Sequence, residues 1–530
     1  MSKVGYRQHS LEDNWDVIVI GSGMGGLSAA ALLAKHGGKR VLVLERHFEA
    51  GGYTHSFHRP GYEWDVGVHY IGEVHDPSSP VRAAYDHLTG GRLRWSPMPE
   101  IYERIVLGPK TYEFVRGAGA FRDGLRSRFP AETRAIDRYL TSVARCTRSM
   151  NLFFAEKVIP APAARLIGGL MRAPHLRWAG RNTAEVLRGL TSNAELAAVL
   201  TAQWGDYGLP PAQSSFAAHA AIAAHYLEGG YYPVGGAGQI VEAIAPEIEA
   251  FGGRIVVGAE VANVLLREGR AAGVRMADGR EFQAPAVVSD AGAVNTFERL
   301  VPAGTPGIGG ILANLRRLPA STSFLALYIG VQASARELGL DGGNLWVHPT
   351  PDHDANLARF IADPAAPFPL LFISFPSAKD PDFERRHPGR ATVEVISPAP
   401  YDWFARWEDT RWKRRGADYD GFKACFASRM QAEVERHVPA LRGRVDYAEL
   451  STPLSVRHFM NYSRGETYGL SASPARFRLP ALRPRTPVPG LYLTGQDVAL
   501  FGVTGALFGG ALAASAVLGR NLMKPLTRPR

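Results

Sequence analysis

Three glycines and one glutamate near the start of the chain have the types and the spacing to hold a phosphate-linked ligand. Gly21, Gly23 and Gly26 form the pattern G-x-G-x-x-G, and Glu45 follows at about the 20-residue distance typical of dinucleotide-binding folds. The first glycine allows a tight turn, the second lets the backbone approach a pyrophosphate, and the third lets a helix pack closely on a strand. A carboxylate at this distance accepts hydrogen bonds from ribose hydroxyls.

The elements around these residues are those that such a site needs. Residues 16–20 predict a short buried strand, and residues 27–38 predict a helix of small and apolar residues whose N-terminus faces the phosphates. A second apolar run, residues 39–44, ends at Glu45. Strand, turn, helix, strand and acid in this order predict a Rossmann-type dinucleotide-binding domain. The choice between NAD and FAD depends on the rest of the chain.

Two further stretches favour FAD. A second glycine pair, Gly51 and Gly52, follows Glu45, and in FAD domains of the glutathione-reductase and amine-oxidase type such a pair lets the chain cross close to the cofactor phosphates. Residues 252–292 read as successive short strands broken by Glu-Gly and Asp-Gly turns. In FAD proteins of this type the residue after the first of these strands, here Val261, meets the adenine through its backbone.

The C-terminal stretch, residues 490–519, also fits FAD. It predicts a strand, a turn that carries Asp497, and a helix of small residues. The carboxylate would accept hydrogen bonds from the ribityl chain, and the helix N-terminus would stabilise negative charge on a reduced flavin. The predicted cofactor-binding residues are Gly21, Ser22, Gly23, Gly26, Glu45, Arg46, Gly52, Tyr53, Val261, Asp497, Val503 and Thr504. No second strand-linked G-x-G-x-x-G occurs, so a separate NADPH-binding domain is not expected and the external electron donor stays open.

With these stretches in view, the chain resembles the phytoene desaturase and carotenoid isomerase superfamily, and within it most closely the retinol saturases. The resemblance is carried by residues 16–57, 63–72, 205–238 and 490–510, of which the last two are the more specific. It implies FAD and chemistry on C=C bonds of a hydrophobic isoprenoid or lipid. Two departures stand out: Tyr53 occupies a position where members often have Arg, and the turn at residues 495–497 reads GQD rather than GD.

Saturation of a C=C bond needs a hydride from the flavin and a proton on the neighbouring carbon. His69 and Tyr468 are the predicted catalytic residues, since His69 follows the segment expected beside the flavin and Tyr468 precedes the last flavin strand. The weaker candidates from the same segments are Tyr70, His219, His225, Tyr226 and Tyr462.

We predict an α/β fold with a Rossmann-type FAD-binding domain of the glutathione-reductase and amine-oxidase type, a mixed-sheet substrate domain and a helical cap. The FAD-binding domain is expected from residues 1–75, 228–300 and 440–530, and the substrate and cap domain from residues 76–227 and 301–439. Residues 322–331, 369–376 and 391–398 are the expected strands of the pocket wall, and residues 379–390 an expected surface loop.

The charge pattern bears on partners and location. The formal net charge is +10, but no dense Lys/Arg run with interleaved aromatic residues predicts nucleic-acid binding. Residues 158–182 carry four arginines among apolar residues and no acidic residue, which fits either a peripheral membrane contact or an ordinary cap helix. The N-terminal residues lack the apolar run of a signal peptide, and nowhere do 18 consecutive apolar residues occur. We therefore expect a cytoplasmic protein, with possible peripheral contact on the inner face of the membrane.

The two cysteines, Cys146 and Cys425, have no metal-ligand spacing, so no metal site is predicted. The leading functional hypothesis is a retinol-saturase-like FAD-dependent reductase. The alternatives are a carotenoid or phytoene desaturase, a flavin-dependent cis–trans polyene isomerase, and a lipid-binding protein that keeps FAD as a structural element. Amine oxidation is disfavoured because no lysine lies between Lys157 and Lys379, where amine oxidases typically place one near the flavin.

Overall fold

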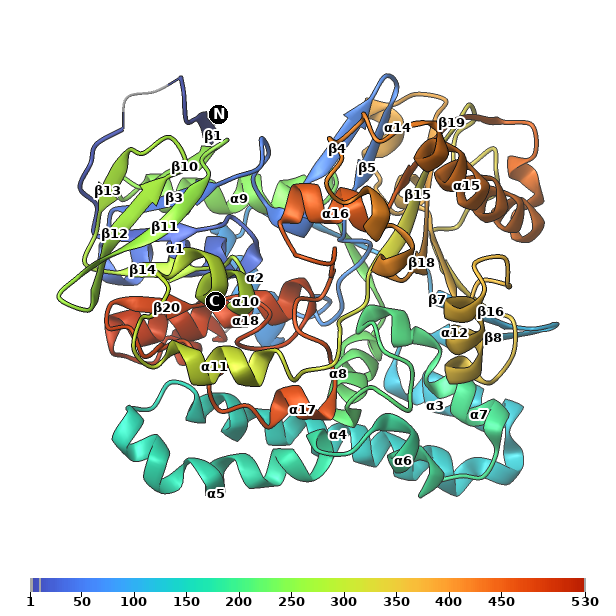
Figure 1. Ribbon diagram of the computed structural model, residues 1–530. Helices are drawn as coiled ribbons and strands as arrows, with labels where there is room; N and C mark the ends of the chain where they lie inside the picture. The colour runs from blue at the N-terminus through green and yellow to red at the C-terminus, as the bar shows by residue number, and fades with distance from the viewer. Residues whose placement is uncertain (1–2, 9–10, 529–530) are drawn as a thin grey trace.

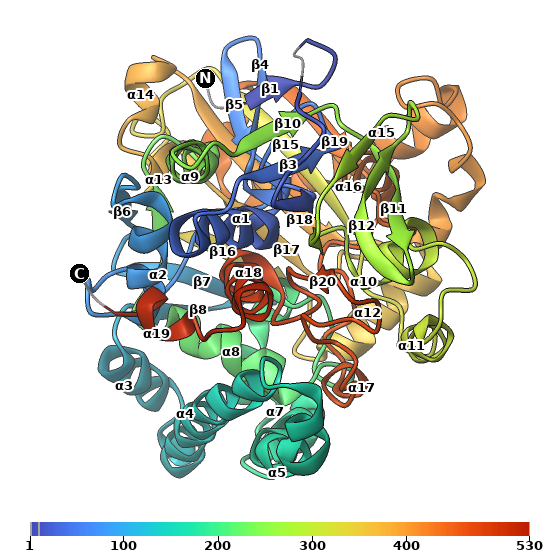
Figure 2. The same cartoon turned by 90° about the vertical axis from the view of Figure 1, so that its left-hand side faces the viewer.

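Two large β-sheets form the two halves of the molecule, and a layer of helices closes one end of both (Figure 1). This computed structural model describes residues 3–8 and 11–528. Figure 2 shows the parallel sheet and its helices from the side. The α/β fold with a Rossmann-type domain and a mixed sheet is the one that the sequence predicts.

The first sheet is six-stranded and entirely parallel in its pairings. The runs VIVI and VLVL of its central strands are buried on both faces, as is typical of parallel strands covered by helices. Helices α1 (Met24–Gly37), α9 (Gly238–Glu249) and α18 (Gly502–Leu518) pack beside it. Its strands in spatial order are β1 (Lys3–Gly5), β10 (Arg254–Val257), β3 (Val41–Glu45), β2 (Val17–Ile20), β14 (Val287–Ser289) and β20 (Leu491–Leu493).

A three-stranded antiparallel sheet connects two of these parallel strands. It consists of β11 (Val261–Arg267), β12 (Arg270–Met276) and β13 (Glu281–Gln283), and it joins β10 to β14. Glu268 and Gly269 form the first turn with positive φ, which is the geometry that an x-Gly hairpin turn requires. The succession of short strands predicted over residues 252–292 is therefore present.

The second sheet has seven strands and is mixed, because β7 and β16 pair in parallel while the other neighbours are antiparallel. In spatial order its strands are β19 (Val445–Ser451), β15 (Phe324–Val331), β18 (Ala391–Pro398), β17 (Leu371–Ser374), β16 (Asn344–His348), β7 (Ile101–Leu107) and β8 (Lys110–Val115). The pocket-wall strands expected from the sequence are β15, β17 and β18. Strand β19 falls in the predicted cofactor segment 440–530 but pairs with β15 in this sheet; the domain division itself stays a prediction.

The helical layer lies at the lower edge of Figure 1. The long helix α4 (Thr133–Glu156) packs against both α5 (Ala161–Ala179) and α8 (Phe216–Tyr226). The shorter helices of this layer are α3 (Ala118–Arg128), α6 (Thr183–Arg188), α7 (Ala194–Leu200) and α17 (Pro474–Phe477). None of the helices in the described ranges has the length and apolar character to cross a bilayer.

The remaining elements border the two sheets. A two-stranded hairpin, β4 (Ser56–Arg59) and β5 (Tyr62–Asp65), stands beside the second sheet, and β6 (Trp95–Pro97) pairs with β9 (Tyr231–Pro233). The helices are α2 (Pro80–Thr89), α10 (Ala293–Asn295), α11 (Ile308–Leu315), α12 (His353–Ala362), α13 (Pro376–Lys379), α14 (Phe383–Arg386), α15 (Ala417–His437), α16 (Pro453–Met460) and α19 (Met523–Leu526).

The prediction of a surface loop over residues 379–390 is wrong at its start. Lys379 and Asp380 are each only 4% exposed, and α14 occupies residues 383–386. Both side chains carry charge, so hydropathy alone places them outside. They are buried because each finds several polar partners inside the fold.

Candidate active site

A cavity of about 1490 Å³ lies between the parallel sheet and the mixed sheet. A pocket for one small ligand typically occupies roughly 300–1,000 Å³. This cavity therefore has room for a dinucleotide and a second, hydrophobic ligand. The glycine-rich loop after β2 lines one end, and apolar side chains of α8 and the mixed sheet line the other.

At the glycine-rich end the backbone is open to a negatively charged group. Helix α1 begins after its N-cap residue Gly23, which has no side chain to bond the first amides. A Cβ at residue 26 would overlap the carbonyl oxygen of Gly21, so the third glycine serves helix–strand packing and does not line the cavity. Ser22 donates from its backbone N and its Oγ to Glu45 Oε2, at 2.9 and 2.7 Å. Ser22 therefore does not line the cavity itself but orients Glu45, which does.

A second helix N-terminus opens into the same cavity. Helix α18 begins at Gly502 with no side-chain cap, and Val503 and Thr504 line the cavity in its first turn. The N–H groups of the first turn and the helix dipole favour a negatively charged group at the N-terminus of each of these two helices. These two helix N-termini face one cavity. They fit a ligand that carries negative charge in two places, such as the pyrophosphate and the ring of a reduced flavin.

The glycine pair after Glu45 brings the chain against the first loop. Gly51 and Gly52 have φ values of 124° and 56°, and a Cβ at Gly52 would lie 3.0 Å from Gly23 Cα. The next residue, Tyr53, lines the cavity, and its hydroxyl is buried without a hydrogen-bond partner among the described residues. Burial raises the pKa of this phenol, so the position provides a polar group without charge.

The other predicted cofactor residues also line the cavity. Arg46 donates to the carbonyl oxygens of His458 and Phe459, at 2.5 and 3.1 Å, which holds it at the cavity wall. Val261 begins β11 at the wall near Glu45. Asp497 accepts from the backbone N of Leu470 at 3.0 Å and of Ala293 at 2.8 Å, so the carboxylate also ties the turn to its neighbours. Of the predicted set only Ser22 and Gly26 do not line the cavity.

Sequence reasoning missed Asp290, which follows β14. Its carboxyl group lies against Gly23 and Gly25, where a Cβ on either glycine would meet one of its oxygens. Burial raises the pKa of this carboxyl to about 8. A hydrogen bond from the backbone of Gly26 acts in the opposite direction and is the smaller effect. The residue is therefore neutral at pH 7 and adds no charge beside the helix N-terminus. Its position after a β-strand, directly before Ala-Gly, was the available signal.

On the opposite wall, His69 is held by a buried carboxylate. His69 Nδ1 lies 2.6 Å from Glu394 Oε2, and the glutamate side chain is 1% exposed. The other glutamate oxygen accepts from the backbone N of Asp65 at 3.0 Å, so Glu394 fixes both ends of the segment. His69 lines the cavity, and no hydrogen bond from the described chain holds its Nε2. Because Glu394 lies far from His69 in sequence, the pairing carried no sequence signal.

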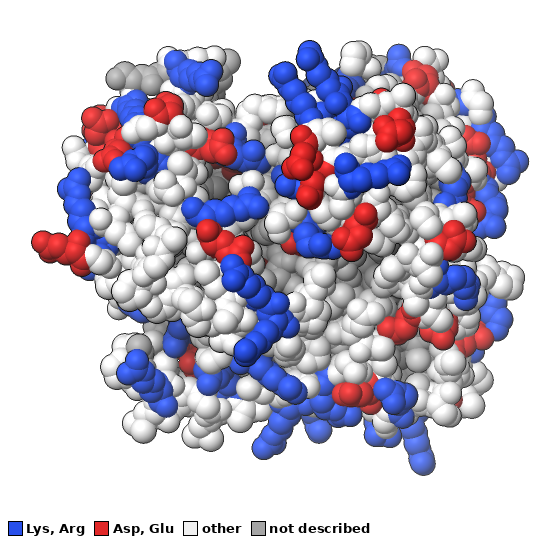
Figure 3. Space-filling model, viewed as in Figure 1, with Lys and Arg blue, Asp and Glu red and all other residues white. Residues whose placement is uncertain are grey.

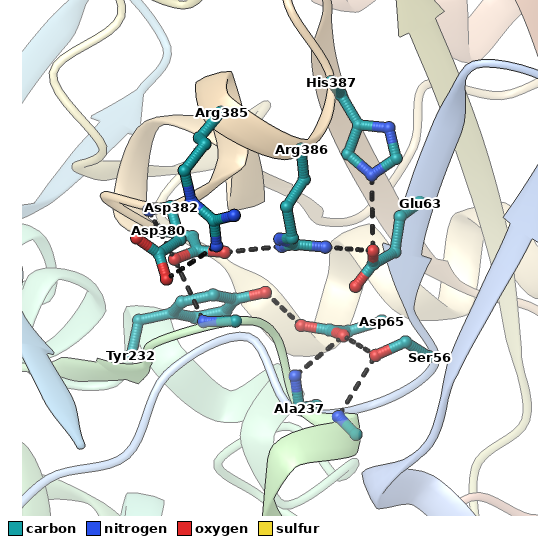
Figure 4. A network of polar contacts seen from close by, with 12 residues as sticks. Ser56, Glu63, Asp65, Tyr232, Ala237, Asp380, Asp382, Arg385, Arg386 and His387 are labelled. Atoms are coloured by element: carbon teal, nitrogen blue, oxygen red, sulfur yellow. Dashed lines mark hydrogen bonds and ion pairs between the residues drawn. The ribbon is translucent and has the colours of Figure 1, made fainter. Parts of the chain in front are cut away.

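The hairpin that leads to His69 is anchored by the network in Figure 4. Asp65 accepts from Ser56 Oγ at 2.6 Å, from the backbone N of Ala237 at 3.0 Å, and from the Tyr232 hydroxyl. The contacts of Glu63 continue the network, since Arg386 and His387 both reach its Oε2. These bonds tie β5 to α9 and α14 and limit movement of the chain that follows.

A buried cation lies directly behind this wall. Lys379 Nζ donates to the His69 carbonyl at 3.1 Å, to Asn344 Oδ1 at 2.5 Å and to Ser374 Oγ at 2.6 Å. Burial lowers its pKa to about 8, while Glu103 acts in the opposite direction. Lys379 does not line the cavity, so it is placed to support the His69 backbone rather than to meet a ligand.

The weaker histidine candidates have structural surroundings. His219 does not line the cavity and is enclosed by the hydroxyls of Tyr139 and Tyr207, at 2.8 and 3.2 Å. His225 lines the cavity, but both ring nitrogens are engaged: Nδ1 lies 3.0 Å from Glu73 Oε2, and Nε2 accepts from the Gly72 backbone at 2.9 Å. Neither ring is free to give a proton to a ligand.

The predicted and candidate tyrosines do reach the cavity. Tyr468 lines it beside the rings of Phe324 and Phe501, and no hydrogen bond within the described chain holds its hydroxyl. Tyr462 accepts from Gln496 Nε2 at 3.3 Å. No group of three His, Cys, Asp or Glu residues in the described ranges has the arrangement of a metal site.

Comparison with known proteins places the chain in a family. A model of the NAD(P)-binding Rossmann-like domain matches residues 19–88. An all-trans-retinol 13,14-reductase of Danio rerio is 37% identical over 98% of this chain and 88% of the relative. The chain belongs to the all-trans-retinol 13,14-reductase family. It is thus an oxidoreductase by family, and the predicted resemblance to retinol saturases is confirmed.

Two relatives with lower identity carry other names. An "inactive all-trans-retinol 13,14-reductase" of Danio rerio is 32% identical over 98% of this chain and 88% of the relative. A chloroplastic prolycopene isomerase of an Oncidium hybrid cultivar is 27% identical over 95% of this chain and 84% of the relative. Among solved structures, putrescine oxidase bound to putrescine has a TM-score of 0.62 at 15% identity, with 96% of this chain and 99% of the other covered. That likeness concerns the fold.

Proposed function

We propose that the protein is an FAD-dependent reductase that saturates a C=C bond of a hydrophobic isoprenoid. The observation that carries the proposal is the pair of helix N-termini, of α1 and α18, that face one cavity and whose N-cap residues form no side-chain hydrogen bond. This arrangement fits the two places where reduced FAD is negatively charged. Family membership supports the reaction class, and the apolar far end of the cavity supports a hydrophobic substrate.

Within this proposal the chain binds, orients and supplies a proton. FAD, when bound, supplies the hydride at N5. The glycine-rich loop would hold the pyrophosphate, and Glu45 would bond the ribose hydroxyls. Gly52 would let the chain cross close to the phosphates, because a Cβ there would lie 3.0 Å from Gly23 Cα. Tyr53 lines the wall without adding charge. The apolar side chains at the far end exclude water, which protects a reduced cofactor from side reactions.

We assign the proton to His69. Its Nδ1 is fixed by Glu394 at 2.6 Å, which leaves Nε2 as the position from which a proton reaches the substrate carbon. The buried side chain of Glu394 also fixes the orientation of the ring in the cavity wall. Tyr468 remains the second candidate, because its hydroxyl is free in the same cavity. Replacing His69 by Gln and Tyr468 by Phe, singly, distinguishes the two: the donor is the residue whose loss slows product formation while flavin content stays normal.

The proposal is tested on purified protein with its own cofactor. The cofactor is released by heat and identified by mass, and the protein is then reduced with dithionite and given all-trans-retinol. FAD in the released fraction and a product two hydrogens heavier than retinol support the proposal. NAD in that fraction contradicts it. A product of unchanged mass with altered double-bond geometry contradicts saturation and favours the isomerase alternative. The 27% identity to a prolycopene isomerase is the observation that supports this alternative.

We further propose that helix α5 lies on an anionic lipid surface. Leu166 and Leu170 are 86% and 78% exposed, and Arg165 and Arg177 are exposed on the same helix. Figure 3 shows basic side chains along the lower edge of the molecule, where the helical layer lies. Apolar residues flanked by arginines are typical of helices that lie in a lipid interface.

The neighbouring helix α4 connects this surface to the cavity. Met150, Asn151 and Phe154 of α4 line the cavity, and α4 packs along α5. A lipophilic substrate would thus pass from the bilayer to the site over a short apolar path. Co-sedimentation with phosphatidylserine vesicles tests the contact: replacement of Leu166 and Leu170 by Ser is expected to reduce binding, and replacement of the exposed Ile361 of α12 is the control. Equal binding of both variants contradicts the proposal.

A further inference from the structure

One carboxyl group stands among the apolar side chains at the far end of the cavity. Asp206 ends the short 3-10 helix η3 (Ala202–Asp206) and lines the cavity. It is half-buried, and the surface that it keeps faces the cavity. The cavity is also lined by apolar residues of one hydrophobic cluster: Ala221, Ile222, Trp346, Leu370, Phe372 and Ile396.

The protein satisfies only part of this carboxyl group. Tyr70 donates its hydroxyl to Asp206 Oδ2 at 3.3 Å, and Gln203 Nε2 donates to the Tyr70 hydroxyl at 3.3 Å. The Tyr70 ring stacks on Tyr226 with 4.3 Å between centroids, which fixes the donor. No hydrogen bond from the described residues reaches Oδ1, and no Lys, Arg or His among them forms an ion pair with Asp206.

An unpaired carboxylate in apolar surroundings is costly, so the neutral acid is the stable form there. Burial, reinforced by the charge of Glu103, raises the pKa of Asp206 well above its usual range. A neutral carboxyl group has one hydrogen-bond donor and an acceptor oxygen to offer. A hydroxyl group of a ligand can accept a hydrogen bond from the carboxyl O–H and donate one to the carboxyl C=O. A carboxylate ligand would instead bring an uncompensated negative charge beside Asp206.

We propose that Asp206 binds the hydroxyl end of an isoprenoid alcohol, and that Tyr70 and Gln203 are the positioning residues that hold its carboxyl group. The inference rests on the proposed function and assigns a specificity-determining residue in the same cavity. Tyr70 directly follows His69, so the hydroxyl site and the assigned proton donor lie on one continuous segment. Anchoring at Asp206 would therefore set which double bond meets the flavin.

The test measures binding without turnover, on the oxidised holoenzyme. Trp346 lines the same wall, so quenching of tryptophan fluorescence reports a bound polyene. The two ligands are all-trans-retinol and the hydrocarbon that has the same polyene chain without the hydroxyl. We expect the wild-type protein to bind the alcohol roughly tenfold more tightly, which is the contribution of one well-placed hydrogen bond.

Two substitutions at Asp206 and one control complete the design. D206L is expected to remove the preference for the alcohol and to leave hydrocarbon binding equal or tighter. D206N keeps a donor and an acceptor, so most of the preference is expected to remain. The control I222A removes an apolar contact nearby and is expected to weaken both ligands equally. Flavin content and far-UV circular dichroism verify that each variant is folded.

The outcomes separate this inference from the proposed function. Equal affinity of wild-type protein for alcohol and hydrocarbon overturns the role of Asp206 and leaves the reductase proposal standing. Preference for the alcohol without formation of a saturated product supports Asp206 and contradicts the reductase proposal. Tighter binding of the corresponding amine than of the alcohol overturns the inference, since Asp206 would then act as a carboxylate. A D206N variant that binds retinol normally but cannot turn it over also overturns it, because the group would be a proton donor.

Discussion

Replacement of Glu394 by Gln is the perturbation that bears most directly on proton delivery. The carboxylate is 1% exposed, lies 2.6 Å from His69 Nδ1, and accepts from the Asp65 backbone through its other oxygen. A glutamine retains the shape, and its carbonyl oxygen can keep the bond to Asp65. Its amide nitrogen then meets Nδ1, which has to accept a hydrogen bond, so the charge-assisted bond that orients the ring is lost.

The size of the expected loss in rate follows from the kind of hydrogen bond that is removed. A hydrogen bond to a charged partner contributes about 1.5–3 kcal/mol, which corresponds to roughly 10- to 150-fold in rate if the interaction is lost in the transition state. We therefore expect kcat for saturation to fall by that factor in E394Q, with KM and flavin content unchanged. The assay is single-turnover product formation by the dithionite-reduced variant.

A matched control is available in the cap. Glu156 is also buried, with its side chain 3% exposed, and it pairs with Arg172 and Arg483 without lining the cavity. E156Q is expected to lower thermal stability and to leave single-turnover kinetics unchanged. If E394Q turns over retinol within twofold of the wild-type rate, the assignment of His69 as a proton donor oriented by Glu394 is refuted.

Two further predictions concern the cofactor loop. Burial raises the pKa of Asp290 from 3.8 to about 8, so the folded protein loses stability as the pH rises between these values. D290N is therefore expected to stabilise the cofactor-free protein by about 4 kcal/mol at pH 7 and not at pH 4. A Tm difference that does not vary with pH in thermal melts would contradict this. Gly52→Ala places a Cβ at positive φ, 3.0 Å from Gly23 Cα, and is expected to weaken FAD binding at least tenfold in a flavin fluorescence titration. The control Gly279→Ala, at φ +91° with no atom within 4 Å, is expected to cost stability alone; equal FAD affinity of both variants would refute the close crossing.

The cofactor end of the cavity was predictable because its signals are local. Glycine spacing, the acid after the second strand and the small-residue helix each lie within one short segment, and each has a direct backbone consequence. Gly26 illustrates the strength of such reasoning, since its predicted packing role follows from the overlap that a Cβ would have with Gly21. Asp290 was not predicted, because a charged acid beside a pyrophosphate site is unfavourable. Burial raises the pKa of its carboxyl, and the burial of one side chain cannot be read from a single sequence.

The substrate end was predictable in its chain segments but not in its pairings. His69 was identified from its segment, yet its partner Glu394 lies on β18 and faces it only after the mixed sheet has formed. Asp206 lay inside a stretch that resembles the family, without any pattern to mark it as an acid that lines the cavity beside apolar residues. Lys379 was expected in a surface loop because residues 379–390 are rich in proline and in charged residues, which are usually exposed. Three specific hydrogen bonds of its ammonium group instead hold the side chain inside the fold.

The measurement that tests the central claim most directly is an anaerobic half-reaction. The holoenzyme is reduced stoichiometrically, all-trans-retinol is added in the absence of oxygen, and the absorbance of the oxidised flavin is followed together with the product mass. We predict that the flavin reoxidises at the same rate at which a product two hydrogens heavier than retinol appears. A flavin that stays reduced while retinol is bound would contradict the proposal that this protein is an FAD-dependent saturase of an isoprenoid alcohol.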